Sequence, residues 1–240
     1  MALVAYNQYD EIPADRPVVV IVEMGAFQRT LAPGSKILAK GGRVVAGGEI
    51  EIVASGDADI KTWDSKVTAK GYATVTASGT AKVVAHDSVK VTAIDRSKVE
   101  LHDIAEGVIR DTATVITSGQ STAEVYNSGM AIAHENSKVE LRDTAMGTFY
   151  DRSKGTVRDI ACAVAYDQAS IRALDNSRIT AGGESTVAAM DRARVRLLGA
   201  ARVEIYTGWR NSVQLISREC GCVVIHLDDK GDQTPAPLVA

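Results

Sequence analysis

The sequence predicts an all-β protein, a single-stranded β-solenoid (β-helix) built from eight-residue repeats. Three observations lead to this fold class. The chain is 45% hydrophobic but only 5% aromatic, so small side chains, mostly Ala and Val, have to fill its core. An eight-residue pattern repeats along most of the chain, and apolar residues alternate with polar ones inside each repeat. So short a unit buries its apolar face only by stacking on its neighbours.

Each octad combines a strand with a turn. Position 1 is Ala, Ser or Gly in every octad from Ala73 to Ala201 except at Val89, and position 5 is apolar everywhere except at Thr117. Apolar residues at positions 1, 3 and 5 give a period of two, which predicts a half-buried strand. Position 7 is Asp, Gly or Asn except at Glu135. These residues tolerate a left-handed backbone, so position 7 predicts a corner.

One coil of the solenoid could contain two octads (about 16 residues, in two opposed sheets) or three octads (about 24 residues, in a triangular prism). Ala, Ser and Val are too small to fill the wide centre of a prism at native packing density, which favours the two-octad coil. Large and small residues also compensate each other within octads. Glycine precedes a larger residue by two positions at Gly107 and Ile109, at Gly147 and Phe149, and at Gly155 and Val157.

The repeat divides the chain into three regions in one continuous body. Residues 1–57 lie outside the octad frame but contain β-like runs at 17–22 and 50–53, so we expect a β-rich N-terminal cap or assembly region. Residues 58–217 form the octapeptide-repeat solenoid, with an unbroken frame from about Ser65 to Ser217. Residues 218–240 contain a capping strand at 223–227 and a short tail.

Composition excludes several classes of protein. A net charge of -3 argues against a strongly basic nucleic-acid binder, and no stretch approaches the roughly 20 apolar residues of a membrane span. The N-terminus lacks the features of a signal peptide, so we expect a cytoplasmic or virion-associated protein. Three cysteines are too few for a disulfide framework.

Two columns of outward residues are candidate binding sites. With two octads per coil, His86, His102 and His134 fall in one column, where imidazoles could bind metal or sense pH; the alternative is a set of ordinary surface residues. A second column could hold phosphates, sugars or an acidic partner, and its alternative is a solvated ladder of long side chains. The residues of the second column are Arg110, Tyr126, Arg142 and Arg158.

We predict no metal, no cofactor and no catalytic residue. The Asp corners lack the paired glycines of calcium-binding β-rolls, and Cys220, Cys222 and His226 offer three zinc ligands without a fourth. Nucleophile, phosphate-loop, dinucleotide and zinc-protease motifs are absent, and an uninterrupted frame leaves no room for catalytic loops between coils. These observations predict that the protein is not an enzyme.

Residues 97–105 (SKVELHDIA), echoed at 137–145 (SKVELRDTA), resemble the octapeptide-repeat proteins of actinobacteria and their phages. The resemblance covers roughly residues 58–217 and implies a β-solenoid rather than an activity. It suggests a non-enzymatic structural or recognition protein, such as a fibre-like or spike-like phage virion component or a host-interaction component. We expect a homo-oligomer with a protein or anionic glycan partner. The alternative is a soluble intracellular binding module that sequesters or inhibits a host factor through a solenoid face.

Overall fold

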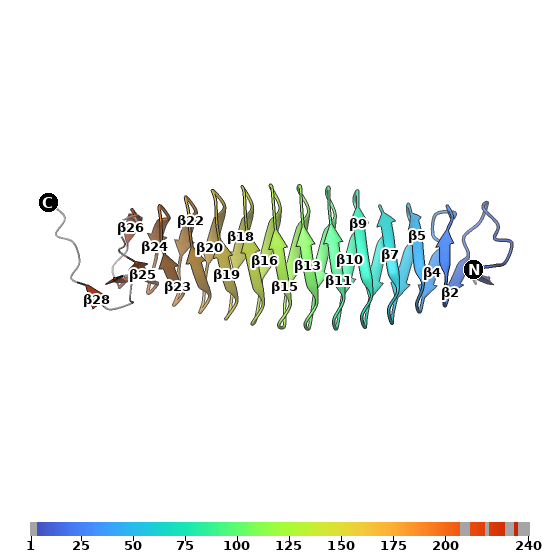
Figure 1. Cartoon of the computed structure of the whole chain (residues 1–240), viewed down its shortest axis with the longest axis horizontal. Helices are drawn as coiled ribbons and strands as arrows, with labels where there is room; N and C mark the ends of the chain where they lie inside the picture. Colours follow the sequence, from blue (N-terminus) through green and yellow to red (C-terminus); the bar gives the residue numbers. More distant parts are fainter. Residues whose placement is uncertain (1–3, 207–211, 219–220, 229–232, 235–240) are drawn as a thin grey trace. The chain divides into compact units, whose positions relative to one another are not determined.

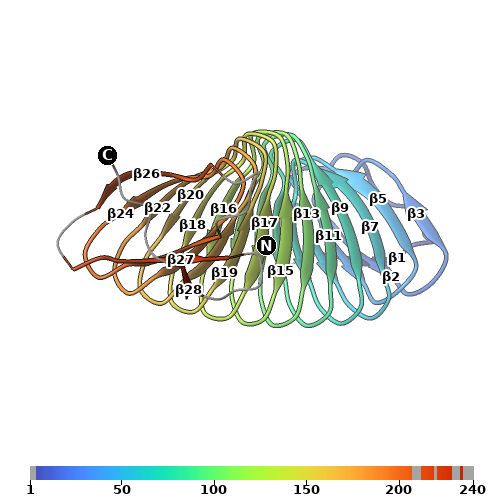
Figure 2. The same cartoon turned by 60° about the vertical axis from the view of Figure 1, so that its left-hand side comes forward.

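The computed structural model describes residues 4–206, 212–218, 221–228 and 233–234. The chain divides into two compact units, Met1–Ala123 and Glu124–Ala240, and the division falls inside strand β15 (Thr122–Val125). Each unit consists mainly of parallel strands, most of them joined by short corners, and the described residues contain no helix. Successive strands alternate between two sheets, and Figure 2 shows the coils as narrow loops. The predicted all-β solenoid is therefore confirmed.

Unit 1 contains an even sheet and an odd sheet, in which the strands follow one another in chain order (Figure 1). The even sheet consists of β1 (Ala5–Asn7), β2 (Val19–Val22), β4 (Lys36–Ala39), β6 (Glu51–Ala54), β8 (Lys66–Ala69), β10 (Lys82–Ala85), β12 (Lys98–Leu101) and β14 (Thr114–Thr117). The odd sheet consists of β3 (Ala26–Gln28), β5 (Arg43–Gly47), β7 (Asp59–Trp63), β9 (Thr74–Ser78), β11 (Lys90–Ala93) and β13 (Glu106–Ile109).

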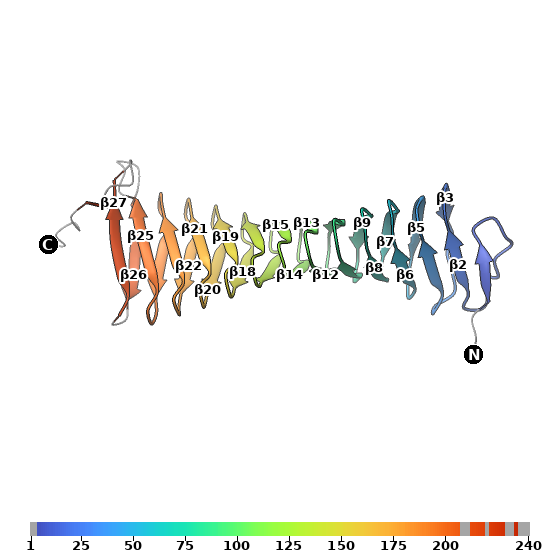
Figure 3. The ribbon, with the colours of Figure 1, turned by 90° about the horizontal axis from the view of Figure 1, so that it is seen from below.

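Unit 2 repeats this arrangement, and Figure 3 shows its strands side by side from another direction. Its even sheet consists of β16 (Met130–Ala133), β18 (Met146–Phe149), β20 (Cys162–Ala165), β22 (Arg178–Ala181), β24 (Arg194–Leu197) and β26 (Gln214–Arg218). Its odd sheet consists of β17 (Lys138–Leu141), β19 (Lys154–Val157), β21 (Ser170–Ala173), β23 (Thr186–Ala189), β25 (Arg202–Tyr206), β27 (Val223–Leu227) and the antiparallel β28 (Gln233–Thr234).

The register confirms two octads per coil. Lys82 pairs with both Lys66 and Lys98, each two octads away, and the same spacing holds in unit 2, where Thr186 pairs with Arg202. Parallel pairing is also present in residues 1–57, which precede the octad frame. Val19, for example, pairs with Lys36. Residues 1–57 therefore contribute strands to the ladder, and their role as a cap or assembly region stays a prediction.

The expectation of an unbroken frame to Ser217 is wrong. Arg194 pairs with Gln214 and Arg202 pairs with Val223, so these coils are longer than two octads, and the register shifts between Val195 and Arg196. Most of the extra residues enter between β25 and β26, where 207–211 lie outside the described residues, and one more enters within β26, where the register passes from Leu215 to Ser217. The predicted strand at 223–227 is present as β27, while 229–232 and 235–240 of the tail also lie outside the described part.

The core of each unit lies between its two sheets. Octad positions 1, 3 and 5 are buried with few exceptions, as sequence periodicity predicted. The largest fully buried side chain is Phe149, which has 0% exposure. A Cβ built on Gly155 would lie 2.7 Å from two ring atoms of Phe149 and 2.6 Å from Ile171 Cδ1. Gly155 therefore makes room for Phe149 and Ile171, and its expected partner Val157 is not among its nearest atoms.

The corners are held by a ladder of carboxylates. Non-glycine residues at position 7, from Asp87 to Asp191, have φ between 53° and 61°, the left-handed region that Asp and Asn tolerate best. Within each unit the carboxylate of one corner accepts a hydrogen bond from a backbone N–H in the preceding coil. Examples are Gly71 N to Asp87 Oδ2 at 3.0 Å in unit 1 and Asp143 N to Asp159 Oδ2 at 3.0 Å in unit 2.

Candidate functional site

Within each unit, the outward residues at octad position 6 form two columns, one at each type of corner. The even corner column follows the even strands and contains His86 and His102 in unit 1 and His134 in unit 2. The odd corner column follows the odd strands and contains Arg110 in unit 1. Its candidates in unit 2 are Tyr126, Arg142 and Arg158.

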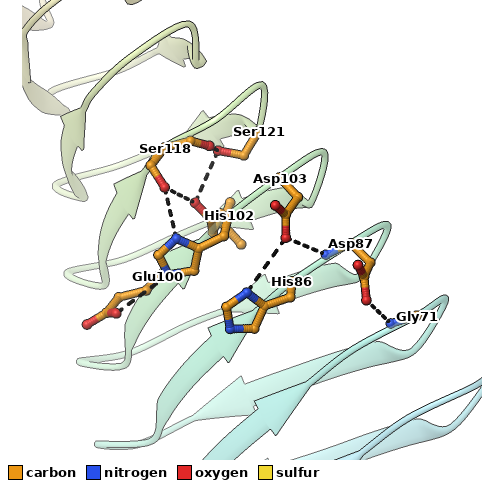
Figure 4. A network of polar contacts seen from close by, with 9 residues as sticks. Gly71, His86, Asp87, Glu100, His102, Asp103, Ser118 and Ser121 are labelled. Atoms are coloured by element: carbon orange, nitrogen blue, oxygen red, sulfur yellow. Dashed lines mark hydrogen bonds and ion pairs between the residues drawn. The ribbon is translucent and has the colours of Figure 1, made fainter.

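The imidazoles of His86 and His102 stack face to face, with centroids 4.8 Å apart and planes inclined by 15°. Each ring also contacts neighbouring polar groups (Figure 4). His86 Nδ1 lies 3.7 Å from Asp103 Oδ2, an oxygen that also accepts the N–H of Asp87. His102 Nδ1 lies 2.9 Å from Ser118 Oγ. The structure thus brings two of the three predicted histidines into one stacked pair, with corner residues fixing their positions.

His134 lies in unit 2, where it stacks on tyrosines. Its ring centroid is 5.1 Å from that of Tyr150, with the planes inclined by 8°, and Tyr150 stacks in turn on Tyr166 at 5.5 Å. His134 Nδ1 lies 3.7 Å from Asp151 Oδ2. Sequence reasoning did not place either tyrosine in the histidine column. The signal was available, because each ring follows the previous one by two octads.

Within the part of the chain that the structure describes, no group of three or more His, Cys, Asp or Glu residues is arranged to hold a metal ion. Of the zinc ligands weighed from the sequence, Cys220 lies outside the described residues. The corner carboxylates considered for calcium accept backbone hydrogen bonds from the preceding coil, so their first partners are protein N–H groups.

The odd corner column in unit 2 forms a compensated charge cluster. Glu140 Oε1 lies 2.9 Å from Arg142 Nη2 and 2.9 Å from Arg158 Nε, so one carboxylate binds both guanidinium groups. The attraction of Glu140 raises the pKa of Arg142. Tyr126 donates its hydroxyl to Glu124 at 2.5 Å, which raises the pKa of the phenol, and Arg142 lies 5.7 Å from its ring centroid. These acids reduce the positive field that an anionic ligand would require.

Sequence reasoning missed a third surface, the outward side of β16, β18 and β20 in unit 2. The three strands are in register, and none of their outward residues is charged. Met130, Ile132 and Met146 are 45%, 39% and 51% exposed. This surface, referred to below as the uncharged face, consists of Met130, Ile132, Met146, Thr148, Cys162 and Val164. The signal was the absence of Lys and Arg from octad position 2 at Met130, Met146 and Cys162.

A groove of about 420 Å³ lies along the even corners of unit 2. Its lining residues are Asp151, Arg152, Asp167, Gln168, Gly183 and Glu184. Arg152 Nε donates to Gln168 Oε1 at 3.4 Å, and Gln168 Nε2 donates to Glu184 Oε2 at 3.4 Å. Three carboxylates and one guanidinium give the groove a net negative charge.

Comparison of the chain with protein-family models, with curated proteins and with solved structures finds no match. The likeness to octapeptide-repeat proteins therefore depends on the repeat sequence alone. Among the described residues, no helix has the length and apolar character that crossing a membrane requires.

Proposed function

We propose that the protein is a non-enzymatic structural or recognition protein, of the fibre-like or spike-like kind suggested by its repeat, and that its copies associate through the uncharged face. The observation that carries this proposal is the cluster of exposed apolar side chains on β16 and β18, which the half-buried Cys162 and Val164 extend onto β20. Solvent-facing positions of a sheet are normally polar, and a contiguous exposed apolar patch is typical of a protein contact surface.

A second copy of the chain fits this face for two reasons. Parallel strands in register place side chains on a regular lattice, about 4.8 Å apart from strand to strand, and the same face of another copy carries the same lattice. The face also contains no charge, so joining two copies buries no unpaired ion. Arg178 on β22 borders it, and Arg194 and Arg196 lie one strand further on β24; repulsion between these arginines of two copies limits how far the copies can slide.

The sequence also predicted a protein or anionic glycan partner at the odd corner column. The pairing of Arg142 and Arg158 with Glu140 makes this column a weaker candidate than the uncharged face. We therefore favour the structural role over sequestration of a host factor through the Arg and Tyr side chains.

The test is the mass of the particle in solution, measured by size-exclusion chromatography with light scattering over a range of concentrations. Wild type should form a homo-oligomer, and Met146→Lys should be monomeric at the same concentrations. Lysine occupies the same octad position at Lys138 and Lys154, so the substitution is compatible with the fold. Thr186→Lys adds the same charge on the odd sheet and should keep the wild-type mass. A monomeric wild type, or an oligomer that Met146→Lys leaves intact, would contradict the proposal.

A further inference from the structure

The indole of Trp63 lies flat on the outer side of the odd sheet in unit 1. Trp63 is the last residue of β7 and is in register with Gly47 of β5. A Cβ built on Gly47 would overlap Cδ2, Cε2 and Nε1 of the indole. Cδ2 and Cε2 form the bond shared by the two rings, which another atom approaches only from a ring face. One face of the indole therefore covers Gly47, whose φ is not left-handed, so the ring and not the backbone requires glycine here.

The opposite face of this indole is directed to solvent. Trp63 is 42% exposed although one of its ring faces is covered, and among the described residues no aromatic ring or guanidinium stacks on it. Its neighbour in register on the other side is Ser78, whose side chain is too short to cover an indole. At the adjacent corner, a Cβ built on Gly48 would meet no atom within 4 Å. We refer to the exposed face of Trp63 as the indole platform.

A cation without an ion pair lies beside the indole platform. Lys61 precedes Trp63 by two residues on β7, so both side chains leave the same side of the sheet, roughly 6.5 Å apart along the strand. Within the described part of the chain, the Lys61 ammonium forms no hydrogen bond or ion pair. The other charged side chains on the outer side of β5 and β7 are Arg43 and Asp59, which pair with each other at 3.6 Å. Lys61 therefore gives this surface a net positive charge.

The ring face and the cation together select an acidic sugar. The negative face of an aromatic ring attracts C–H groups such as those on the flat side of a pyranose, and an uncompensated ammonium attracts a carboxylate. Glu49 and Asp64 follow Gly48 and Trp63 at the corner, so an anionic group is directed away from the corner and toward Lys61. A nucleic-acid strand, with a phosphate on every unit, would need several cations and would meet these carboxylates.

We propose that the indole platform and Lys61 form a binding site for an acidic sugar of a glycan, a hexuronic acid whose ring stacks on Trp63 and whose carboxylate binds Lys61. Neither residue was among the candidates drawn from the sequence. The inference goes beyond the proposed function and does not depend on it, because the indole platform belongs to unit 1 and the uncharged face to unit 2.

The test compares four probes by ligand-observed NMR titration of the full chain. Trigalacturonate should bind about fivefold more tightly than its methyl ester, which keeps the sugar rings and removes the charges. Citrate, which has as many carboxylates as trigalacturonate but no sugar ring, should also bind at least about fivefold more weakly. Equal binding of the acid and the ester, or citrate binding as tight as that of trigalacturonate, would overturn the proposal. Oligothymidylate should bind more weakly than trigalacturonate, and tighter binding would favour a nucleic acid and overturn it too.

Two variants locate the site. Trp63→Leu keeps an apolar side chain but removes the aromatic face, so it should weaken trigalacturonate binding about tenfold while preserving the circular dichroism spectrum. Lys61→Gln removes the charge, so it should bind trigalacturonate no more tightly than the methyl ester. Tyr72→Leu, which changes a tyrosine 77% exposed in unit 1, and Lys90→Gln, whose lysine is paired with Glu106, are the matched controls and should bind as wild type does.

Unchanged affinity in Trp63→Leu would place the binding elsewhere and refute the proposal, and so would an unchanged preference for the acid in Lys61→Gln. The mass of the particle separates these outcomes from a failure of the proposed function, because both variants leave the uncharged face intact and should keep the wild-type oligomeric state.

Discussion

Gly155→Ala is expected to destabilise unit 2, although alanine is normally the better residue in a strand. The φ of Gly155 is not left-handed, so alanine can adopt the backbone conformation without strain. The added methyl group would lie 2.6 to 2.7 Å from Ile171 Cδ1 and from two ring atoms of Phe149. Phe149 is completely buried, so its rigid ring has no solvent-exposed space into which it can move.

The magnitude follows from two opposing effects. Replacing glycine by alanine at a compatible position stabilises a protein by about 0.4–1 kcal/mol, because the unfolded chain loses conformational entropy. Overpacking a filled core costs about 1–3 kcal/mol. The cost of overpacking exceeds the stabilisation from the entropy effect, so we expect the free energy of unfolding to fall by about 1–2 kcal/mol.

The assay is urea unfolding at 25 °C, followed by the circular dichroism of the strands. Gly182→Ala is the matched control, because its methyl group meets Tyr166 and Ala165 at 3.6 to 3.8 Å, and it should be neutral or up to about 1 kcal/mol more stable than wild type. Adding Phe149→Leu to Gly155→Ala removes the ring atoms at the clash, and the double-mutant cycle should give a coupling of about 1 kcal/mol. The reasoning is refuted if Gly155→Ala is as stable as Gly182→Ala, or if the cycle shows no coupling.

Two further predictions concern the corners. Asp143→Ala should lower the free energy of unfolding by about 2 kcal/mol, because alanine is strained at φ +55° and cannot accept the hydrogen bond from Asn127 N. Asp143→Asn, which tolerates this φ and keeps an oxygen acceptor, should cost under about 0.5 kcal/mol in the same urea assay. Equal losses in the two variants would show that the corner does not depend on a carboxylate or amide oxygen. Hydrogen bonds from the backbone N–H and hydroxyl of Thr80 lower the pKa of Asp64 below its ordinary 3.8, so its contribution to stability is present above that pH and is lost as the pH falls through the folded-state pKa. Between pH 5 and pH 2, the free energy of unfolding should therefore fall more steeply with decreasing pH for wild type than for Asp64→Asn. Parallel curves of the two proteins would contradict this linkage.

Much of the fold could be predicted because the constraints are local and repeated. Alternating apolar positions identify the strands, and Asp or Gly at position 7 identifies the corners. The two-octad coil followed from side-chain volume, and the pairing of Lys82 with Lys66 and Lys98 confirms it. The frame could not be followed to Ser217, because the pairing of Arg194 with Gln214 and of Arg202 with Val223 depends on contacts between coils that the octad pattern does not contain.

The candidate sites were predicted less completely, because a site depends on contacts between coils. The two-octad spacing placed His86 and His102 in one column, and their rings do stack. The spacing alone could not show that Glu140 forms ion pairs with both Arg142 and Arg158 and so reduces the positive charge of the odd corner column.

The sequence by itself determined the repeating unit, the inward and outward alternation and the small side chains of the core, because each of these depends on residues close together in one octad. Only the tertiary structure decided what each outward residue does. The partner of a corner carboxylate, the neighbours of an arginine and the space next to a glycine all belong to the next coil, two octads away in sequence and one strand spacing away in space.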